Sequence, residues 1–229
     1  MSRSAARVKE AVKATSKTKI KDARQALYRE HILDAAEKVF ADNGYEAAKV
    51  VSMATEAGVS LATIYGSFEN KWEIYRALHA SRTEALDALV RERGIAAASG
   101  NTLERMLAGI TAYIEFHMKN TSYLRMHLRE GHAWFTNRSL QSPEQVAAYS
   151  AGLKMVIKAF ENGVREGLYT DEERPELMAR TMLAMHQVRL ADWVDRGMKE
   201  SFDEIRDGVH SQFVRTFCTR TGRALYKRP

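Results

Sequence analysis

Apolar residues recur mainly at intervals of three and four from residue 27 onward, which is the period of amphipathic α-helices. The first such segment includes Ile32 and Phe40, and we expect it to end at Asn43-Gly44, a typical helix stop. Two short apolar segments follow, at residues 50–57 and 61–68, and glycine separates them. The pattern therefore predicts helices from the start of the periodic region, and no long Val, Ile or Thr run indicates a sheet.

The same period continues to the end of the chain, in longer segments. Further helices are predicted at residues 70–93, 103–114, 123–131, 143–164, 175–196 and 202–220. Together the segments predict an all-α protein of about nine helices, in which a small bundle is followed by a larger one. We place a basic arm at residues 1–25, a first domain at residues 26–78 and a second domain at residues 79–229.

Composition narrows the class of protein. The chain has 229 residues and a single cysteine, Cys218, so it has no internal disulfide and a reducing compartment is expected. No stretch approaches the roughly 20 apolar residues that cross a bilayer, and the basic start lacks the apolar segment of a signal peptide. We therefore expect a cytoplasmic protein with no membrane partner, and we do not expect a secreted or largely disordered one.

The net charge of +6 is located in one segment. Residues 1–25 carry eight basic and two acidic groups, which accounts for the whole excess, and the rest of the chain is neutral. Residues 26–78, in contrast, hold five basic and eight acidic residues. The arm is expected to be disordered, because its few apolar residues cannot form a core. A solubilising tail and a transit peptide remain alternative interpretations of its composition.

The segment from Val50 to Lys71 reads VVSMATEAGVSLATIYGSFENK and has the layout of a helix-turn-helix. Gly58 allows the left-handed backbone that the turn needs, and Ser60 is placed to cap the second helix. Ala54 and Ala57 are small enough for the two helices to cross closely. Such a unit can present its second helix to the major groove of DNA, although a purely structural helix pair is the alternative.

Residues 32–78 resemble the DNA-binding domain of the tetracycline-repressor (TetR) family of bacterial regulators. The matching landmarks are Ala36, Phe40, Gly44-Tyr45, Ala54, Ala57-Gly58-Val59-Ser60, Thr63-Ile64-Tyr65, Phe68 and Lys71. The resemblance implies an all-α fold with an N-terminal three-helix helix-turn-helix domain and a larger C-terminal helical bundle. It also implies a homodimer that binds double-stranded DNA, and a second domain that binds a small effector.

The resemblance suggests DNA contacts residue by residue. Tyr65 and Lys71 match positions that contact phosphate, and residues 60–65 match the recognition helix. The alternative without a function is a partly buried core tyrosine for Tyr65 and a solvated lysine for Lys71. The family commonly has a threonine where this chain has Lys49, which cannot cap a helix but can bind phosphate. Residues 60–67, which include the predicted recognition helix, contain no Arg, Lys, Asn or Gln, the side chains that form two hydrogen bonds to one base. The predicted DNA-binding residues are Lys49, Ser60, Leu61, Ala62, Thr63, Tyr65 and Lys71.

Because the domain at residues 26–78 is net acidic, its surface alone is a poor binder of polyanions. We therefore hypothesise that residues 1–25 supply the missing electrostatic attraction, for example in an adjacent minor groove.

The second domain contains an aromatic and methionine-rich stretch with histidines, which is typical of a pocket for a hydrophobic or amphipathic molecule. The alternative is an ordinary core, since such residues at helical spacing are commonly buried. The predicted pocket residues are His117, Tyr123, Met126, His127, Trp134, Phe135, Met155, Met182 and His186.

Neither metal-ligand spacing nor a catalytic motif is recognisable. His127 and His132 point to different sides of a helix, and Cys218 lies near a helix end where its thiol is not activated. We therefore predict no metal site, no cofactor and no enzymatic activity. The last two helices look apolar on more than one face, which predicts one burial partner inside the subunit and one outside it. The family resemblance implies that the outer partner is a second copy of the chain.

The sequence thus favours a ligand-responsive repressor that a small hydrophobic or amphipathic effector releases from a near-palindromic operator. The alternative is an architectural DNA-organising protein without a functional effector pocket.

Overall fold

The computed structural model describes residues 2–129 and 143–226, with side chains from Gln25 onward except at 143–145 and 148. These residues form ten helices: α1 (Ser2–Ala47), α2 (Val50–Glu56), α3 (Leu61–Tyr65), α4 (Lys71–Ala96), α5 (Thr102–Lys119), α6 (Thr121–Arg129), α7 (Pro143–Arg165), α8 (Pro175–Asp195), α9 (Phe202–Phe217) and α10 (Arg220–Leu225). The predicted all-α fold is confirmed, because the described part of the chain contains no strand beyond one isolated bridge between Tyr169 and Cys218. No helix of this part is long and apolar enough to span a membrane.

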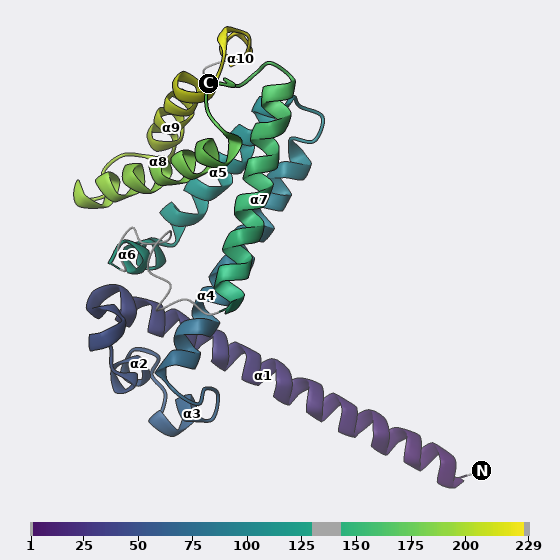
Figure 1. Cartoon of the computed structure of the whole chain (residues 1–229). Helices are drawn as coiled ribbons and strands as arrows, with labels where there is room; N and C mark the ends of the chain where they lie inside the picture. The colour runs from purple at the N-terminus through teal and green to yellow at the C-terminus, as the bar shows by residue number, and fades with distance from the viewer. Residues whose placement is uncertain (1, 130–142, 227–229) are drawn as a thin grey trace. The chain divides into compact units, whose positions relative to one another are not determined.

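The chain divides into two compact units, Met1–Leu78 and His79–Pro229, and α4 contains residues of both. In unit 1, α1 loses helical geometry at Gly44, whose φ of 74° is the left-handed conformation expected of a stop. The chain then enters α2 and α3, which lie near the C-terminal end of α1 (Figure 1). Their shared core contains Ile32, Ala36, Phe40, Met53, Ile64, Phe68, Ile74, Tyr75 and Leu78.

The segment at residues 2–25, for which the sequence analysis expects disorder, is helical in the structure and continues α1 (Figure 1). The physical reason is that extending an existing helix avoids the cost of nucleation. The segment is also rich in Ala, Lys and Arg, which are good helix formers. The segment has too few apolar residues to form a core, and for that reason the sequence analysis expected disorder. A helix that continues α1 does not need such a core.

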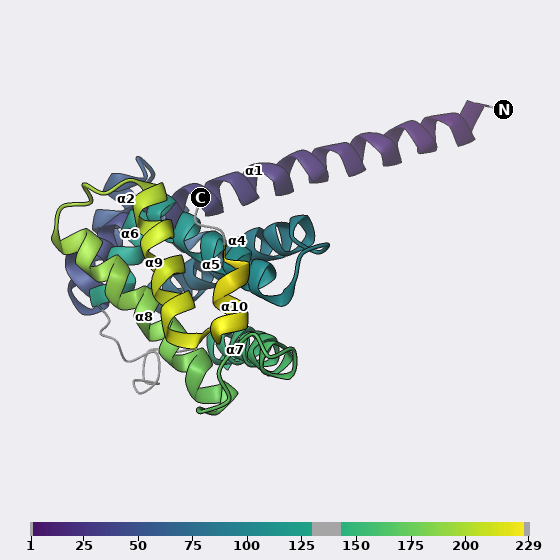
Figure 2. The ribbon, with the colours of Figure 1, turned by 90° about the horizontal axis from the view of Figure 1, so that it is seen from above.

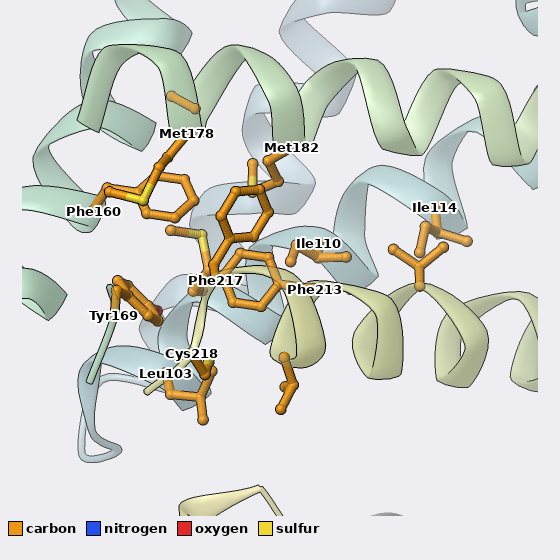
Figure 3. Packing of buried hydrophobic residues seen from close by; sticks show 14 of the residues in the cluster. Leu103, Ile110, Ile114, Phe160, Tyr169, Met178, Met182, Phe213, Phe217 and Cys218 are labelled. Carbon is orange, nitrogen blue, oxygen red and sulfur yellow. The ribbon is translucent and has the colours of Figure 1, made fainter. Parts of the chain in front are cut away.

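Unit 2 is built around an apolar cluster that draws on α5, α7, α8 and α9. The rings of Phe160, Tyr169, Phe213 and Phe217 contact one another in tilted or edge-to-face pairs, at ring-centroid separations of 5.2 to 5.9 Å (Figure 3). Met178 and Met182 of α8 belong to the same cluster and lie beside these rings. Figure 2 shows α9 running beside α8 and α5, so that the last two long helices close the unit.

The short helix α10 has no counterpart in the sequence prediction of about nine helices. Thr219 caps it and also donates its hydroxyl to the carbonyl of Gly167 at 2.7 Å. This contact joins positions 52 residues apart, so no local pattern could predict it. The same joint is packed without spare room, because a Cβ on Gly222 would collide with the carbonyl of Leu168.

Candidate functional site

The α2–turn–α3 unit has the geometry that its sequence predicts. Gly58 has a φ of 61°, and the backbone N–H of Val59 closes the turn onto the carbonyl of Ala54 at 3.0 Å. Ser60 caps α3 by accepting the backbone N–H of Thr63 at 3.0 Å. Ala54 is buried, as its small size suggested. The segment is therefore a helix-turn-helix, held by local hydrogen bonds.

The outer face of α3 is solvent-exposed. Tyr65 is 52% exposed and Leu61 39% exposed, and Ala62 lies on the same open face. Ile64, on the opposite side, is completely buried and anchors the helix to the core. Tyr65 is therefore not a core tyrosine, and its hydroxyl is accessible to a partner.

The hydroxyl groups of Ser60 and Thr63, two of the predicted DNA-binding residues, are hydrogen-bonded to each other. Ser60 Oγ and Thr63 Oγ1 are 2.8 Å apart, and Ser60 Oγ also accepts the N–H of Thr63. One hydroxyl hydrogen is used within the pair, so only one remains to donate outward. The polar readout of α3 is consequently small, and its face offers mainly apolar contacts and the Tyr65 hydroxyl.

Lys49 is exposed at the N-terminus of α2, where its side chain makes no capping hydrogen bond. Three other basic residues in the range 26–78 form hydrogen bonds or ion pairs within the fold. Arg29 donates to the carbonyl of Ser67 and pairs with Glu73, Lys38 pairs with Glu56, and Lys71 donates to backbone carbonyls. Arg76 also has an interaction within the fold. Among the described residues 26–78, Lys49 is thus the cation for which the structure gives no partner.

Lys71 occupies a different environment from the one that its predicted phosphate contact suggests. Its Nζ donates to the carbonyl oxygens of Tyr45, Glu46 and Ala48 at 2.7, 3.1 and 3.2 Å, and it lies 4.5 Å from the ring centre of Tyr45. A lysine ammonium has three donors, and all three are used here. In the structure Lys71 therefore stabilises the end of α1, and a phosphate contact would require it to leave these carbonyls.

Two residues that the sequence analysis did not single out also position α3. Arg29 donates to the carbonyl of Ser67 at 2.7 Å and stacks 4.1 Å above the ring of Phe68. His31 Nε2 donates to the carbonyl of Ala57 at 2.9 Å. Both partners lie 26 or more residues away in the sequence, so a reading of local patterns had no signal for them.

The predicted effector residues fall into different places. His117, Tyr123, Met126, His127, Met182 and His186 are buried in unit 2. Met155 is 56% exposed on α7, so the structure does not bury it with the other predicted pocket residues, and its role in a pocket stays a prediction. Met182 belongs to the apolar cluster of Figure 3. Trp134 and Phe135 lie outside the described residues.

A small cavity lies between α5, α6 and α8. It is lined by Tyr113, His117, Leu124, His127, Leu128, Gln187 and Leu190, of which only the two histidines were predicted. Its enclosed space of about 10 Å³ is close to what one water molecule needs. The polar lining groups are two imidazoles, a phenol and an amide. Binding of a larger molecule would therefore require this cavity to widen.

The cavity belongs to a continuous series of histidine and tyrosine rings. Ring-centroid separations are 4.6 Å for Tyr123–His127, 4.2 Å for Tyr113–His117 and 5.7 Å for Tyr113–His186. His79, the first residue of unit 2, is hydrogen-bonded through Nδ1 to the hydroxyl of Tyr123 at 3.1 Å. We call the residues His79, Tyr113, His117, Tyr123, His127 and His186 the histidine–tyrosine cluster.

Burial disfavours the charged form of three imidazoles in unit 2. Burial first, and then the proximity of His127, lower the pKa of His117 to about 3. Burial likewise lowers the pKa of His186 to about 3 and the pKa of His210, on α9, to about 4. Both ring nitrogens of His186 lack a hydrogen-bond partner within the described residues. Those residues contain no group of three or more His, Cys, Asp or Glu that could hold a metal ion.

The roles of Lys71 and Lys49 are separable by substitution. Lys71→Met leaves three carbonyls without their donor, and we expect the free energy of unfolding of unit 1 to fall by about 1.5–3 kcal/mol. Lys49→Met, the matched control at an exposed site, should change it by less than about 0.5 kcal/mol but should weaken DNA binding. Urea denaturation and DNA titration measure the two effects. Equal stability of the two variants would contradict the structural role of Lys71.

The buried imidazoles also predict the dependence of stability on pH. In the unfolded chain they bind protons near an ordinary pKa of 6.5, whereas in the folded chain they do so only near 3 to 4. Stability should therefore fall as pH drops below 6.5, by about 1 kcal/mol per histidine between pH 7 and pH 5.5. Urea denaturation of the wild type and of His186→Leu should show a weaker pH dependence for the variant. Parallel curves would show that His186 titrates normally.

Comparison with known protein families gives a match in the N-terminal part of the chain. Residues 32–78 match the model of the family described as bacterial regulatory proteins, tetR family. No curated protein sequence matches the chain closely enough to count as a relative.

Solved structures resemble the fold over most of the chain. The ketosteroid transcriptional regulator of Mycobacterium tuberculosis has a TM-score of 0.70 at 19% identity, covering 84% of this chain and 95% of its own. The transcriptional regulator FadR of Bacillus subtilis, solved in complex with stearoyl-CoA, has a TM-score of 0.66 at 19% identity, covering 81% and 97%. PfmR, a TetR family transcriptional regulator of Thermus thermophilus, has a TM-score of 0.66 at 22% identity, covering 80% and 97%.

At these identities the likeness concerns the fold, whereas the match over residues 32–78 concerns the sequence itself. That match covers the whole α2–turn–α3 unit together with the parts of α1 and α4 that hold it. Residues 32–78 therefore form an N-terminal domain of the kind found in bacterial regulatory proteins of the tetR family.

Proposed function

We propose that the chain is a cytoplasmic, homodimeric repressor that binds a near-palindromic operator and is released from it by a small hydrophobic or amphipathic effector. The observation that carries this proposal is the exposed, Ser60-capped α3 inside a sequence-matched tetR-family domain. A helix-turn-helix presents its second helix to the major groove, and dimers bind two half-sites one helical turn or a multiple of it apart.

The DNA contacts proposed for this surface divide by chemistry. Lys49 and the Tyr65 hydroxyl are suited to phosphate oxygens, which fix the position of the protein on the duplex. Leu61 and Ala62 are suited to thymine methyl groups, and one hydroxyl of the Ser60–Thr63 pair to a base edge. Such a face has few bidentate hydrogen bonds. Sequence selectivity would therefore come in part from the shape and deformability of the operator.

The proposed dimer uses the last two long helices. On α8, Met178 and Met182 face the core of unit 2, whereas Leu177 is 39% and Val188 63% exposed. The helix thus has an apolar line on its outer side as well as its inner one. An exposed apolar line on a long helix is typical of an association surface, and a second copy of α8 and α9 would cover it.

The effector response would be a shift between two shapes of the dimer. A molecule that binds better to the shape with poorly spaced recognition helices lowers the affinity for the operator by linkage. The regulator FadR of Bacillus subtilis, which shares the fold, has been solved with stearoyl-CoA, which supports ligand binding by this architecture. Because α4 contains residues of both units, we propose it as the element that transmits the change.

Selection of bound sequences from random double-stranded DNA tests the proposal. We expect enrichment of paired, inverted half-sites and a stoichiometry of two chains per site. Ala62→Asp places a carboxylate on the exposed face of α3 and should abolish binding, because it repels phosphate and requires no change in the core. Ala151→Asp, on an exposed position of α7, is the matched control and should bind normally. Binding without sequence enrichment would favour the architectural alternative.

The contribution of the basic segment is tested by its salt dependence. Residues 1–25 carry eight basic and two acidic groups. We propose that this segment binds the DNA backbone. Deletion of residues 1–25 should weaken binding and lower the slope of log affinity against log salt by about 0.9 for each phosphate that the segment neutralises.

A full-length chain with the eight basic residues of this segment replaced by Gln is the matched control for that deletion. It keeps the length of the segment and removes its charge, so it should behave as the deletion does. A deletion with an unchanged slope would show that the segment is only a solvated tail.

A further inference from the structure

Helix α3 is too short to fix its own position. It has five residues, and a helix of that length is not stable without packing. Ile64, which is completely buried, and Phe68, just beyond the helix, anchor it to the core of unit 1. Contacts between apolar side chains are non-directional, so they hold α3 against the core without fixing its rotation there. Directional hydrogen bonds at the two ends of the segment are needed for that constraint.

Two side chains of α1 donate to carbonyl oxygens on either side of α3. His31 Nε2 donates to the carbonyl of Ala57, before the turn, at 2.9 Å. Arg29 Nη1 donates to the carbonyl of Ser67, after the end of α3, at 2.7 Å. Helix α1 therefore holds the turn and the recognition helix from both flanks.

The contacts of Arg29 differ in strength. Its Nη2 lies 3.7 Å from Oε1 of Glu73, and the two side chains are 41% and 35% exposed, so this ion pair contributes little. The bond to Ser67 joins a full charge to a carbonyl at a short distance, which makes it a stronger interaction. The guanidinium also lies 4.1 Å from the ring centre of buried Phe68. The hydrogen bond and the ring contact are thus the main constraints on residues 67–68.

A planar guanidinium suits this combination of contacts. It donates hydrogen bonds in its own plane while its face lies on an aromatic ring, and a lysine ammonium has no such face. The turn that Arg29 contacts is also held from α4. Glu73 Oε2 accepts the N–H of Glu69 at 2.6 Å, and the N–H of Glu73 donates to Asn70 Oδ1 at 2.9 Å. The segment after α3 is thus fixed between α1 and the start of α4.

We propose that Arg29 is a positioning residue, which sets the orientation of α3 and thereby the selectivity of the protein among DNA sequences, without itself contacting DNA. The proposal rests on the DNA binding stated under Proposed function. Base contacts carry selectivity and require an accurately placed helix. Attraction to phosphate depends mainly on charge. Loss of the Arg29 contacts should therefore reduce selectivity much more than non-specific affinity.

Arg29→Met tests this proposal, because it removes the hydrogen bond and keeps an unbranched side chain. We expect the affinity for the sequence selected from random DNA to fall about tenfold, which is the effect of about one mismatched base pair. Affinity for a duplex of random sequence should stay within about twofold of the wild type, with an unchanged salt slope. Fluorescence anisotropy at a series of salt concentrations measures both affinities.

Two further variants separate position from charge. Lys38→Met removes an equal charge from α1 but loses only an exposed ion pair with Glu56 of α2, so it should keep the selectivity of the wild type. Arg29→Lys keeps the charge but cannot bind the carbonyl of Ser67 and cover the ring of Phe68 together. It should therefore fail to restore selectivity, and it is also the second variant in case Arg29→Met does not fold.

Hydrogen exchange of the free chain gives a readout that does not depend on DNA. The N–H groups of Gly66 and Phe68 are bonded to the carbonyls of Ala62 and Ile64, so they report on the end of α3. Peptides that cover residues 57–70 should exchange at least about threefold faster in Arg29→Met than in the wild type. Peptides from unit 2 should exchange at the rate of the wild type.

The outcomes separate this inference from the proposed function. A salt slope that falls by about 0.9 in Arg29→Met would show a direct phosphate contact of Arg29 and overturn the positioning role. Unchanged selectivity or exchange in Arg29→Met, rescue by Arg29→Lys, or an equal loss in Lys38→Met would overturn it too. In each of these cases a selective wild type leaves the proposed function intact. A wild type that selects no sequence would contradict the proposed function and, with it, the role of Arg29 in selectivity.

Discussion

The geometry of the DNA-facing unit depends on the ammonium group of Lys71. The end of every helix leaves carbonyl oxygens without internal partners, and in this chain α1 ends only a few residues before α2 begins. Lys71, at the start of α4, donates to three of those carbonyls and lies against the Tyr45 ring. One cation thus joins the end of α1, the entry to α2 and the start of α4. Arg29 adds a second link, from α1 to the turn after α3.

This internal use of cations has an electrostatic consequence. The fold of residues 26–78 has more acidic than basic residues, and its arginines and lysines are largely bound within it. Under the proposed function, positive charge for DNA would come from Lys49 and from the segment before the fold. The face of α3 is poor in groups that read bases. Attraction and selectivity would then be carried by different parts of the chain, and the salt dependence of binding can detect this arrangement.

Unit 2 differs in that its buried polar residues are mainly histidines. Five histidines are at most 8% exposed, and those with lowered pKa values owe the shift first to burial. Apolar side chains at His186 would avoid an unsatisfied group, so retaining the imidazole costs stability.

The sequence by itself determined the helical class, the positions of most helices and the helix-turn-helix, because these depend on spacing, caps and glycine turns within a few residues. Gly58 and Ser60 are local signals of this kind. Only the tertiary structure decided that Lys71 binds carbonyls, that Met155 faces outward and that Tyr113 and Gln187 join the histidines around one cavity. Those outcomes depend on contacts between residues far apart in the chain. Helical periodicity states which residues share a face, but not which face meets which neighbour.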